Sequence, residues 1–166
     1  MESSDTSLMK GSDQVSLFRL LCKVLSDNGW DYVYNEKNEI VRLEIRGVNT
    51  TFYSFLIVDE EQESLLCNTH IKQRIPPAKH LEVCELMNRI NYELANGNFE
   101  MDLEDGEIRF RTFLDLANAE PSKEQILNLI WNGVQSFDTY YPGLMKLVYG
   151  GLSPAEAVRY CDREQE

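Results

Sequence analysis

Long hydrophobic runs are missing from this sequence of 166 residues. The longest apolar stretch, Phe52 to Val58, includes Ser54 and is far shorter than the roughly 20 apolar residues of a membrane-spanning helix. The first residues have neither the positive charge nor the apolar run of a signal peptide. We therefore expect a cytoplasmic protein that does not span a membrane.

Positive charge is also scarce. There are 16 Lys and Arg residues against 28 Asp and Glu residues, which gives a formal net charge of −12. Both halves of the chain are acidic, so no basic segment stands out. Because binding to phosphate backbones and anionic membranes draws on clustered Lys and Arg, we expect neither nucleic acid nor a membrane as a partner.

Cysteines are few and widely spaced, and they form no Cys-x-x-Cys pair. They stand at positions 22, 67, 84 and 161, which is no disulfide framework and indicates reduced thiols, most of them in the core. The glycine-rich nucleotide motifs, the hydrolase Gly-x-Ser-x-Gly and the metalloprotease His-Glu-x-x-His are absent too. The sequence therefore predicts no enzyme, no catalytic residue and no cofactor.

One set of residues has the chemistry of a metal site. Cys67 and His70 are followed by His80 and Cys84, and four Cys and His ligands can close a tetrahedral zinc site. If residues 65–71 form a strand, however, Cys67 points inward and His70 outward. We therefore interpret the four as core thiols and surface imidazoles, and we predict no metal site.

The hydrophobic pattern that is present indicates an α+β domain. Apolar residues recur at helical spacing after Asp13, from Leu81 to Leu94 and after Ser122, and they alternate along residues 41–45. The segment 51–58 is apolar on both parities, which predicts a central strand. The expected order is α-β-β-β(-β)-α-β-β-α, with an antiparallel sheet and helices mainly on one face.

Residues 98–114 show the strongest local pattern. Phe99 and Met101 alternate with acidic residues, Asp105-Gly106 is a two-residue turn signal, and the alternation then resumes. A β-hairpin with that turn places Glu100 opposite Arg111 on the outer side. The next helix, after Ser122, is expected to be interrupted at Tyr140 to Gly143, because this segment contains a proline and a glycine.

The chain divides into three parts by composition. We expect a disordered lead at 1–11, a single α+β domain at 12–150 and a C-terminal helical extension at 151–166. The extension begins with a Ser153-x-x-Glu156 capping box.

A surplus of aromatic residues falls on the side of the predicted sheet that the helices do not cover. Alternation places Phe113 on this outer face, and Tyr53 and Phe55 share one parity of the central strand. These three residues are our candidate interface to another protein or to a second copy. The alternative is that the C-terminal segment of the same chain covers this face.

Several stretches resemble the YbjN-like family. They are the run from Leu86 to Tyr92, the hairpin from Gly97 to Thr112, and Tyr141-Pro-Gly143. The resemblance implies a type III secretion chaperone-like fold and a homodimer, with no catalytic residues to carry over, and the tail suggests a cyanobacterial or plastid-related branch. The family is described as a regulator of sensory transduction.

From these observations we predict a non-enzymatic module, chaperone-like or regulatory, that binds a protein partner or client through apolar sheet and helix surface. The alternative is a small-molecule sensor or an enzyme without a recognisable motif, with a pocket near Trp131, Tyr140 and Tyr141.

Overall fold

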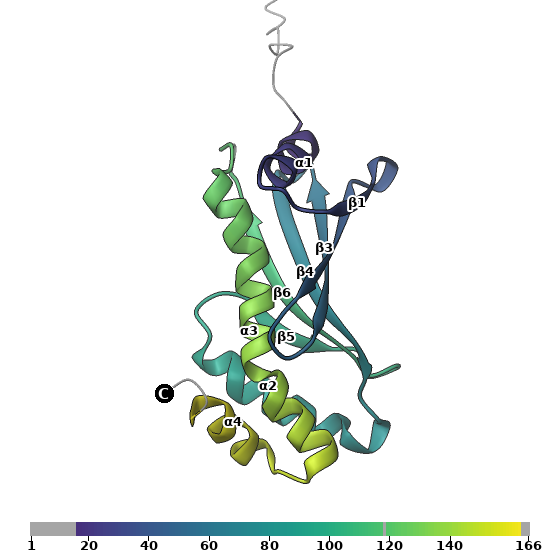
Figure 1. The fold of residues 1–166 in the computed structure, drawn as a ribbon, viewed down its shortest axis with the longest axis vertical. Coiled ribbons are helices and arrows are strands. Elements are labelled where there is room, and N and C mark those ends of the chain that lie inside the picture. Colours follow the sequence, from purple (N-terminus) through teal and green to yellow (C-terminus); the bar gives the residue numbers. More distant parts are fainter. Residues whose placement is uncertain (1–15, 118, 164–166) are drawn as a thin grey trace, which may run out of the picture.

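Six strands form one antiparallel sheet in the order β1-β2-β3-β4-β6-β5 (Figure 1). The computed structural model describes residues 16–117 and 119–163. The strands are β1 (Tyr32–Asn35), β2 (Ile40–Arg46), β3 (Thr51–Asp59), β4 (Ser64–Arg74), β5 (Asn98–Met101) and β6 (Glu107–Asp115).

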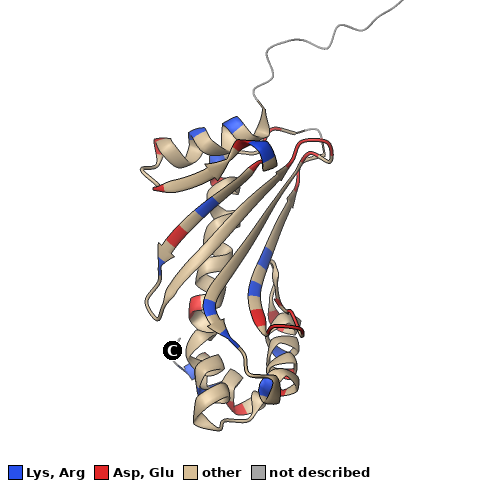
Figure 2. Cartoon of the chain, turned by 90° about the vertical axis from the view of Figure 1, so that its right-hand side faces the viewer, with Lys and Arg blue, Asp and Glu red and all other residues tan. Residues whose placement is uncertain are grey.

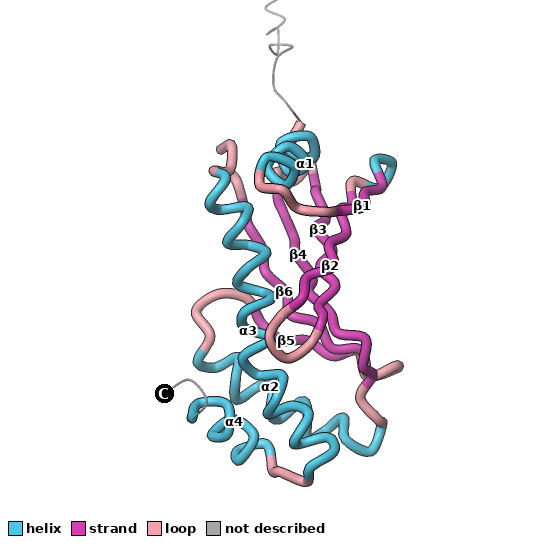
Figure 3. The backbone as a smooth tube through the Cα atoms, viewed as in Figure 1, coloured by secondary structure: helices cyan, strands magenta, loops and turns pink. Residues whose placement is uncertain are grey.

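The helices form a second layer on one side of this sheet, as Figure 3 shows. They are α1 (Leu17–Asp27), α2 (His80–Glu93), α3 (Lys123–Gly150) and α4 (Pro154–Arg163). Helix α3 packs along β3, β4 and β6, and α2 packs against β5, α3 and α4. The predicted α+β class, with helices mainly on one face of an antiparallel sheet, is confirmed.

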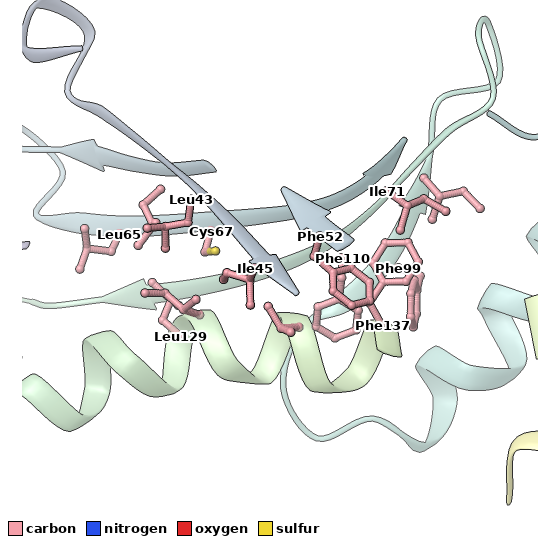
Figure 4. Packing of buried hydrophobic residues seen from close by; sticks show 14 of the residues in the cluster. Leu43, Ile45, Phe52, Leu65, Cys67, Ile71, Phe99, Phe110, Leu129 and Phe137 are labelled. Carbon is pink, nitrogen blue, oxygen red and sulfur yellow. The ribbon is translucent and has the colours of Figure 1, made fainter. Parts of the chain in front are cut away.

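The hydrophobic core lies between the sheet and α3 (Figure 4). The period-two pattern of the strands turns one set of side chains toward the helix, and the centre of the core is aromatic. The ring of Phe137 in α3 packs against the rings of Phe52 and Phe99, with centroids 5.5 and 5.1 Å away. Phe99 in turn packs against Phe110 at 4.8 Å. Edge-on and tilted contacts of this kind add about 0.5–1.5 kcal/mol per pair to the burial itself.

A glycine sets how closely α3 approaches the sheet. A Cβ atom on Gly133 would lie 2.7 Å from Oγ1 of Thr69. The hydroxyl of Thr69 bonds that of Ser54 at 2.9 Å, and the hydroxyl of Thr112 donates to the carbonyl of Leu129 in α3 at 2.8 Å. The buried hydroxyls at this crossing are therefore paired, as burial requires.

Helix α3 runs to Gly150 without a break, so the interruption predicted near residue 140 is wrong. Pro142 lies inside the helix and has no N–H to donate to the carbonyl of Asp138, four residues earlier. The side-chain amide of Asn49 donates to that carbonyl instead, at 3.0 Å. The carboxylate of Asp138 accepts from two backbone N–H groups of the same β2–β3 turn, at 2.6 and 2.9 Å.

The hairpin of β5 and β6 is present, but its predicted register is wrong by two residues. Glu100 lies opposite Arg109 rather than Arg111, and the turn spans residues 102–106. Gly106 has φ +74°, and its carbonyl accepts from the N–H of Ile75 at 2.9 Å. Since the shift is an even number of residues, each side chain keeps its predicted face.

The C-terminal helix α4 packs on α2 and α3 rather than on the other face of the sheet. Ala157 and Cys161 are buried there, beside Gly143, where an added Cβ would lie 2.5 Å from Sγ of Cys161. The lead predicted at 1–11 lies outside the described residues, and the division of the chain at residue 150 stays a prediction.

Candidate partner-binding face

One face of the sheet has no helix over it in the part of the chain that the structure describes, as Figure 2 shows by turning this face to the viewer. We call it the open face. Strand parity decides which side chains reach it, because residues opposite each other in neighbouring strands point to the same side. Its central members are Arg42 and Glu44 of β2, Tyr53, Phe55 and Ile57 of β3, Leu66, Asn68, His70 and Lys72 of β4, and Arg109, Arg111 and Phe113 of β6.

An apolar row crosses this face near one end. Phe113 lies opposite Leu66, Leu66 opposite Ile57, and Ile57 opposite Ile40. The side chain of Phe113 is 61 % exposed, and the other three are partly buried. We name these four residues the apolar row.

Tyr53 lies on the open face, but its side chain is buried, whereas we expected it to be exposed. Only 8 % of it is accessible, because Arg42 and Lys72 lie over its ring, 5.5 and 5.0 Å from the centroid. Cations in this position are attracted by the negative face of the ring. The aromatic surface predicted here is therefore capped by positive charge.

Phe55 connects the apolar row to a polar region. Its ring meets the ring of His70 edge-on, with centroids 5.4 Å apart. Nδ1 of His70 lies 3.1 Å from a carboxylate oxygen of Glu107, and Glu107 also pairs with Arg74. Burial lowers the pKa of His70 below its ordinary value, and the charges of Arg109 and Arg74 act in the same direction, while Glu107 opposes them.

Cys67 and His70, two of the four residues that we considered as metal ligands, lie on opposite faces of β4, as strand parity predicted. Cys67 points into the core, where burial raises the pKa of its thiol to about 11, and His70 lies on the opposite, open face. His80 is turned toward the backbone, with Nε2 2.9 Å from the carbonyl oxygen of Ile75. Among the described residues no group of three or more Cys, His, Asp or Glu side chains is placed to hold a metal ion.

The pocket suggested near Trp131, Tyr140 and Tyr141 is not one site. The ring of Trp131 packs edge-on against Trp30 at 5.2 Å, and the hydroxyl of Tyr141 accepts from the amide of Gln73 at 3.0 Å. Tyr140 instead lines a groove of about 760 Å³ between α2 and α4. Successive helical residues point in different directions, which separates these three side chains.

The edge strand β5 is closed to a further strand at its centre. The side chain of Asn91 in α2 accepts from the N–H of Phe99 at 2.8 Å and donates to its carbonyl at 3.1 Å. Free backbone groups at a sheet edge are what allow an extra strand to add. A partner therefore finds the open face of the sheet more accessible than this edge.

Comparison with protein families identifies the chain. The family model of YbjN, described as "Putative bacterial sensory transduction regulator", matches residues 18–146. The chain belongs to the YbjN family. The matched region includes the whole sheet and most of α3 and ends before α4.

Solved structures with this fold include YbjN from E. coli and the ExsC–ExsE complex. The crystal structure of YbjN from E. coli has a TM-score of 0.55 at 13 % identity. The match covers 73 % of this chain and 85 % of the YbjN chain. ExsC in the ExsC–ExsE complex has a TM-score of 0.54 at 14 % identity, with 72 % of this chain covering 86 % of that chain. At this identity the likeness shows the YbjN and chaperone-like fold. No curated protein matches the chain in sequence, and the cyanobacterial or plastid-related branch stays a prediction.

Sequence reasoning missed part of the open face of this YbjN-family protein. Leu66 and Ile40 complete the apolar row, and Lys72 and Arg42 cap Tyr53. A signal for the β4 residues was available, because the even positions of residues 64–74 must point away from Cys67. Among the described helices, none has the length and apolarity to cross a bilayer.

Proposed function

We propose that this YbjN-family chain is a non-enzymatic module that binds a protein partner or client with the open face of its sheet, in a chaperone-like or regulatory role. The observation that carries the proposal is the exposed ring of Phe113 on β6, continued across the sheet by the other members of the apolar row. An apolar patch with a polar surround on an otherwise acidic protein is typical of an interaction site.

Two comparisons support this proposal. The family is described as a regulator of sensory transduction, and ExsC, which shares the fold, is seen in a complex with ExsE. A protein partner is therefore the favoured occupant, and neither nucleic acid nor membrane is expected on a chain of net charge −12. The cytoplasmic location and the homodimer stay predictions, and sedimentation of the purified chain measures the second.

Affinity capture from the native source tests the proposed function. Three baits are compared: the wild type, Phe113→Arg on the open face, and Leu81→Arg on the helical layer. Leu81 is 85 % exposed, so this control introduces the same charge at a surface that the proposal does not use. We expect a defined protein on the wild type and on Leu81→Arg, and its loss from Phe113→Arg.

Folding of each bait is checked by circular dichroism before capture. The same partner on Phe113→Arg would contradict the use of the open face. Capture of nothing but further copies of the chain would contradict client binding.

A further inference from the structure

The open face carries a large share of the positive charge of an acidic chain. Six of the 16 Lys and Arg residues lie on its strands, together with five acidic residues of the same face, Glu44, Asp59, Glu100, Glu107 and Asp115. Figure 2 shows the basic residues along the sheet, with acidic residues on the strands and in the loops at both ends. The six basic residues are Arg42, Arg46, Lys72, Arg74, Arg109 and Arg111. A negative partner segment that is repelled by the rest of the molecule is therefore attracted to those cations of this face that have no carboxylate partner.

Part of this charge surrounds a groove of about 480 Å³. Tyr53 and Phe55 contribute an aromatic lining, Arg42, Lys72 and Arg74 contribute the cations, and His70 and Glu107, which pairs with Arg74, also line the groove. Cations held over an aromatic ring remain open to a carboxylate on their outer side. The groove thus presents positive charge above an apolar base.

Three of the six cations, Arg42, Arg46 and Lys72, form no ion pair among the described residues, and two of them, Arg42 and Lys72, line the groove. Arg109 and Arg111 both pair with Glu100, and Arg74 pairs with two carboxylates. Glu44 lies on the same face and attracts Lys72 without forming an ion pair with it, so it offsets the charge of Lys72 only in part. The charge of Arg42 and Lys72 is available to a partner.

Strand β4 contributes a residue both to the groove and to the apolar row. On β4, Leu66 belongs to the row and Lys72 to the groove, six residues further on. Six strand residues span about 20 Å. An extended peptide that runs along β4 can therefore contact both with side chains about six residues apart.

We propose that the partner binds through an extended acidic segment, with carboxylates over Arg42 and Lys72 and apolar side chains over the apolar row. This inference rests on the proposed function and specifies the chemistry of the partner. It also accounts for the capping of Tyr53, because the same two cations that bury the ring form the carboxylate site.

Selection from a displayed library of random dodecapeptides tests the inference and does not require the natural partner. A dodecapeptide is about 40 Å long when extended, which exceeds the roughly 20 Å that separates Leu66 from Lys72 along β4. The full chain is used as wild type, as the Arg42→Glu/Lys72→Glu variant, and as the Arg19→Glu/Lys123→Glu variant. The last pair is exposed on helices and makes the same change in charge.

We expect the peptides selected by the wild type and by Arg19→Glu/Lys123→Glu to be enriched about threefold in Asp and Glu over the starting library, together with apolar residues. We expect the acidic enrichment to be lost on Arg42→Glu/Lys72→Glu. Binding of a selected peptide should weaken as salt rises.

Three outcomes would overturn the inference. Apolar enrichment without Asp and Glu, abolished by Phe113→Arg, would leave the proposed function standing and reject the acidic segment. Equal acidic enrichment on the Arg42→Glu/Lys72→Glu variant would place the carboxylates elsewhere. A wild type that sediments as a dimer, selects no peptide and becomes a monomer with Phe113→Arg would make a second copy the occupant.

Discussion

At the scale of single residues, Asp138 and Asn49 explain how a proline is kept inside a long helix. The side chain of Asn49 takes the place of the N–H that Pro142 lacks, and Asp138 anchors the backbone of the turn that carries Asn49. Asn49 of the turn bonds to α3 and Asp138 of α3 bonds to the turn, so these hydrogen bonds stabilise both the β2–β3 turn and α3.

This pairing predicts the effect of Asp138→Ala. Hydrogen bonds to a charged group contribute more than neutral ones, and these lie near the surface, so we expect the free energy of unfolding to fall by about 1–2 kcal/mol. Urea denaturation measures it. Gln135→Ala, an exposed change in the same helix, is the control and should stay within about 0.5 kcal/mol of the wild type. Equal effects of the two changes would contradict the role of Asp138.

A second residue-scale prediction concerns His70. Because burial lowers its pKa in the folded chain, the unfolded chain binds more protons than the folded chain as the pH falls through the ordinary value of 6.5, and the contribution of His70 to stability then decreases. We compare wild type with His70→Gln by urea denaturation at about pH 7.5 and about pH 5.5, on either side of that value. The free energy of unfolding of the wild type, relative to that of His70→Gln, should be smaller at the lower pH.

The variant removes the imidazole and leaves every carboxylate in place, so subtracting its pH dependence isolates His70. A difference that stays constant with pH, or that moves in favour of the wild type on acidification, would show that the pKa of His70 is not lowered by folding.

At the scale of elements, close approach at glycine fixes how α4 packs on α3. A Cβ on Gly143 would lie 2.5 Å from Sγ of Cys161 and 2.6 Å from the carbonyl oxygen of Ala157. Gly150, in the same helix, has its nearest such neighbour at 3.6 Å. Both glycines lie in α3, but only Gly143 has close neighbours in α4, so the two positions make a matched pair for substitution.

We therefore expect Gly143→Ala to lower the free energy of unfolding by about 1–3 kcal/mol through overpacking. Gly150→Ala should leave it unchanged or raise it by up to about 1 kcal/mol, since alanine favours the helix more than glycine does. Thermal and urea denaturation of both variants measure the contrast. A stabilising Gly143→Ala would mean that α4 does not pack closely on α3.

The elements also show what the sequence could and could not predict. Alternation was sufficient to place Phe113 and Phe55 on the outer face, because strand parity is a local property. It could not place the β5–β6 turn, since Gly106 docks on Ile75, a contact distant in sequence. The continuous α3 was hidden for the same reason, because the partner that replaces the proline N–H lies in the β2–β3 turn.

The candidate site was predictable to a similar extent. Parity identified Tyr53 as a residue of the outer face, but its exposure depended on Arg42 and Lys72 from two neighbouring strands. A one-dimensional pattern gives the direction of a side chain, whereas the charges that lie over it follow from the cross-strand register.

At the scale of the whole molecule, the two faces of the sheet have separate tasks. The inner face holds the core with α1 and α3, and the chain as a whole is acidic, with a net charge of −12. The open face is free of that structural work. Substitutions there are expected to change binding more than folding.

The separation of tasks extends to the C-terminal segment, and a chain ending at Gly150 tests it. Removing α4 uncovers α2 and the last turns of α3 and deletes buried Ala157 and Cys161, so we expect the free energy of unfolding to fall by about 2–4 kcal/mol. The sheet and the Trp30–Trp131 contact, which lies far along α3 from α4, should persist, and tryptophan fluorescence should stay native-like. A control chain ending at Arg163 keeps α4 and should match the wild type. Unchanged stability on removal would show that residues 151–166 are an extension that the domain does not need, whereas loss of the native fluorescence would make α4 part of the core of a single folding unit.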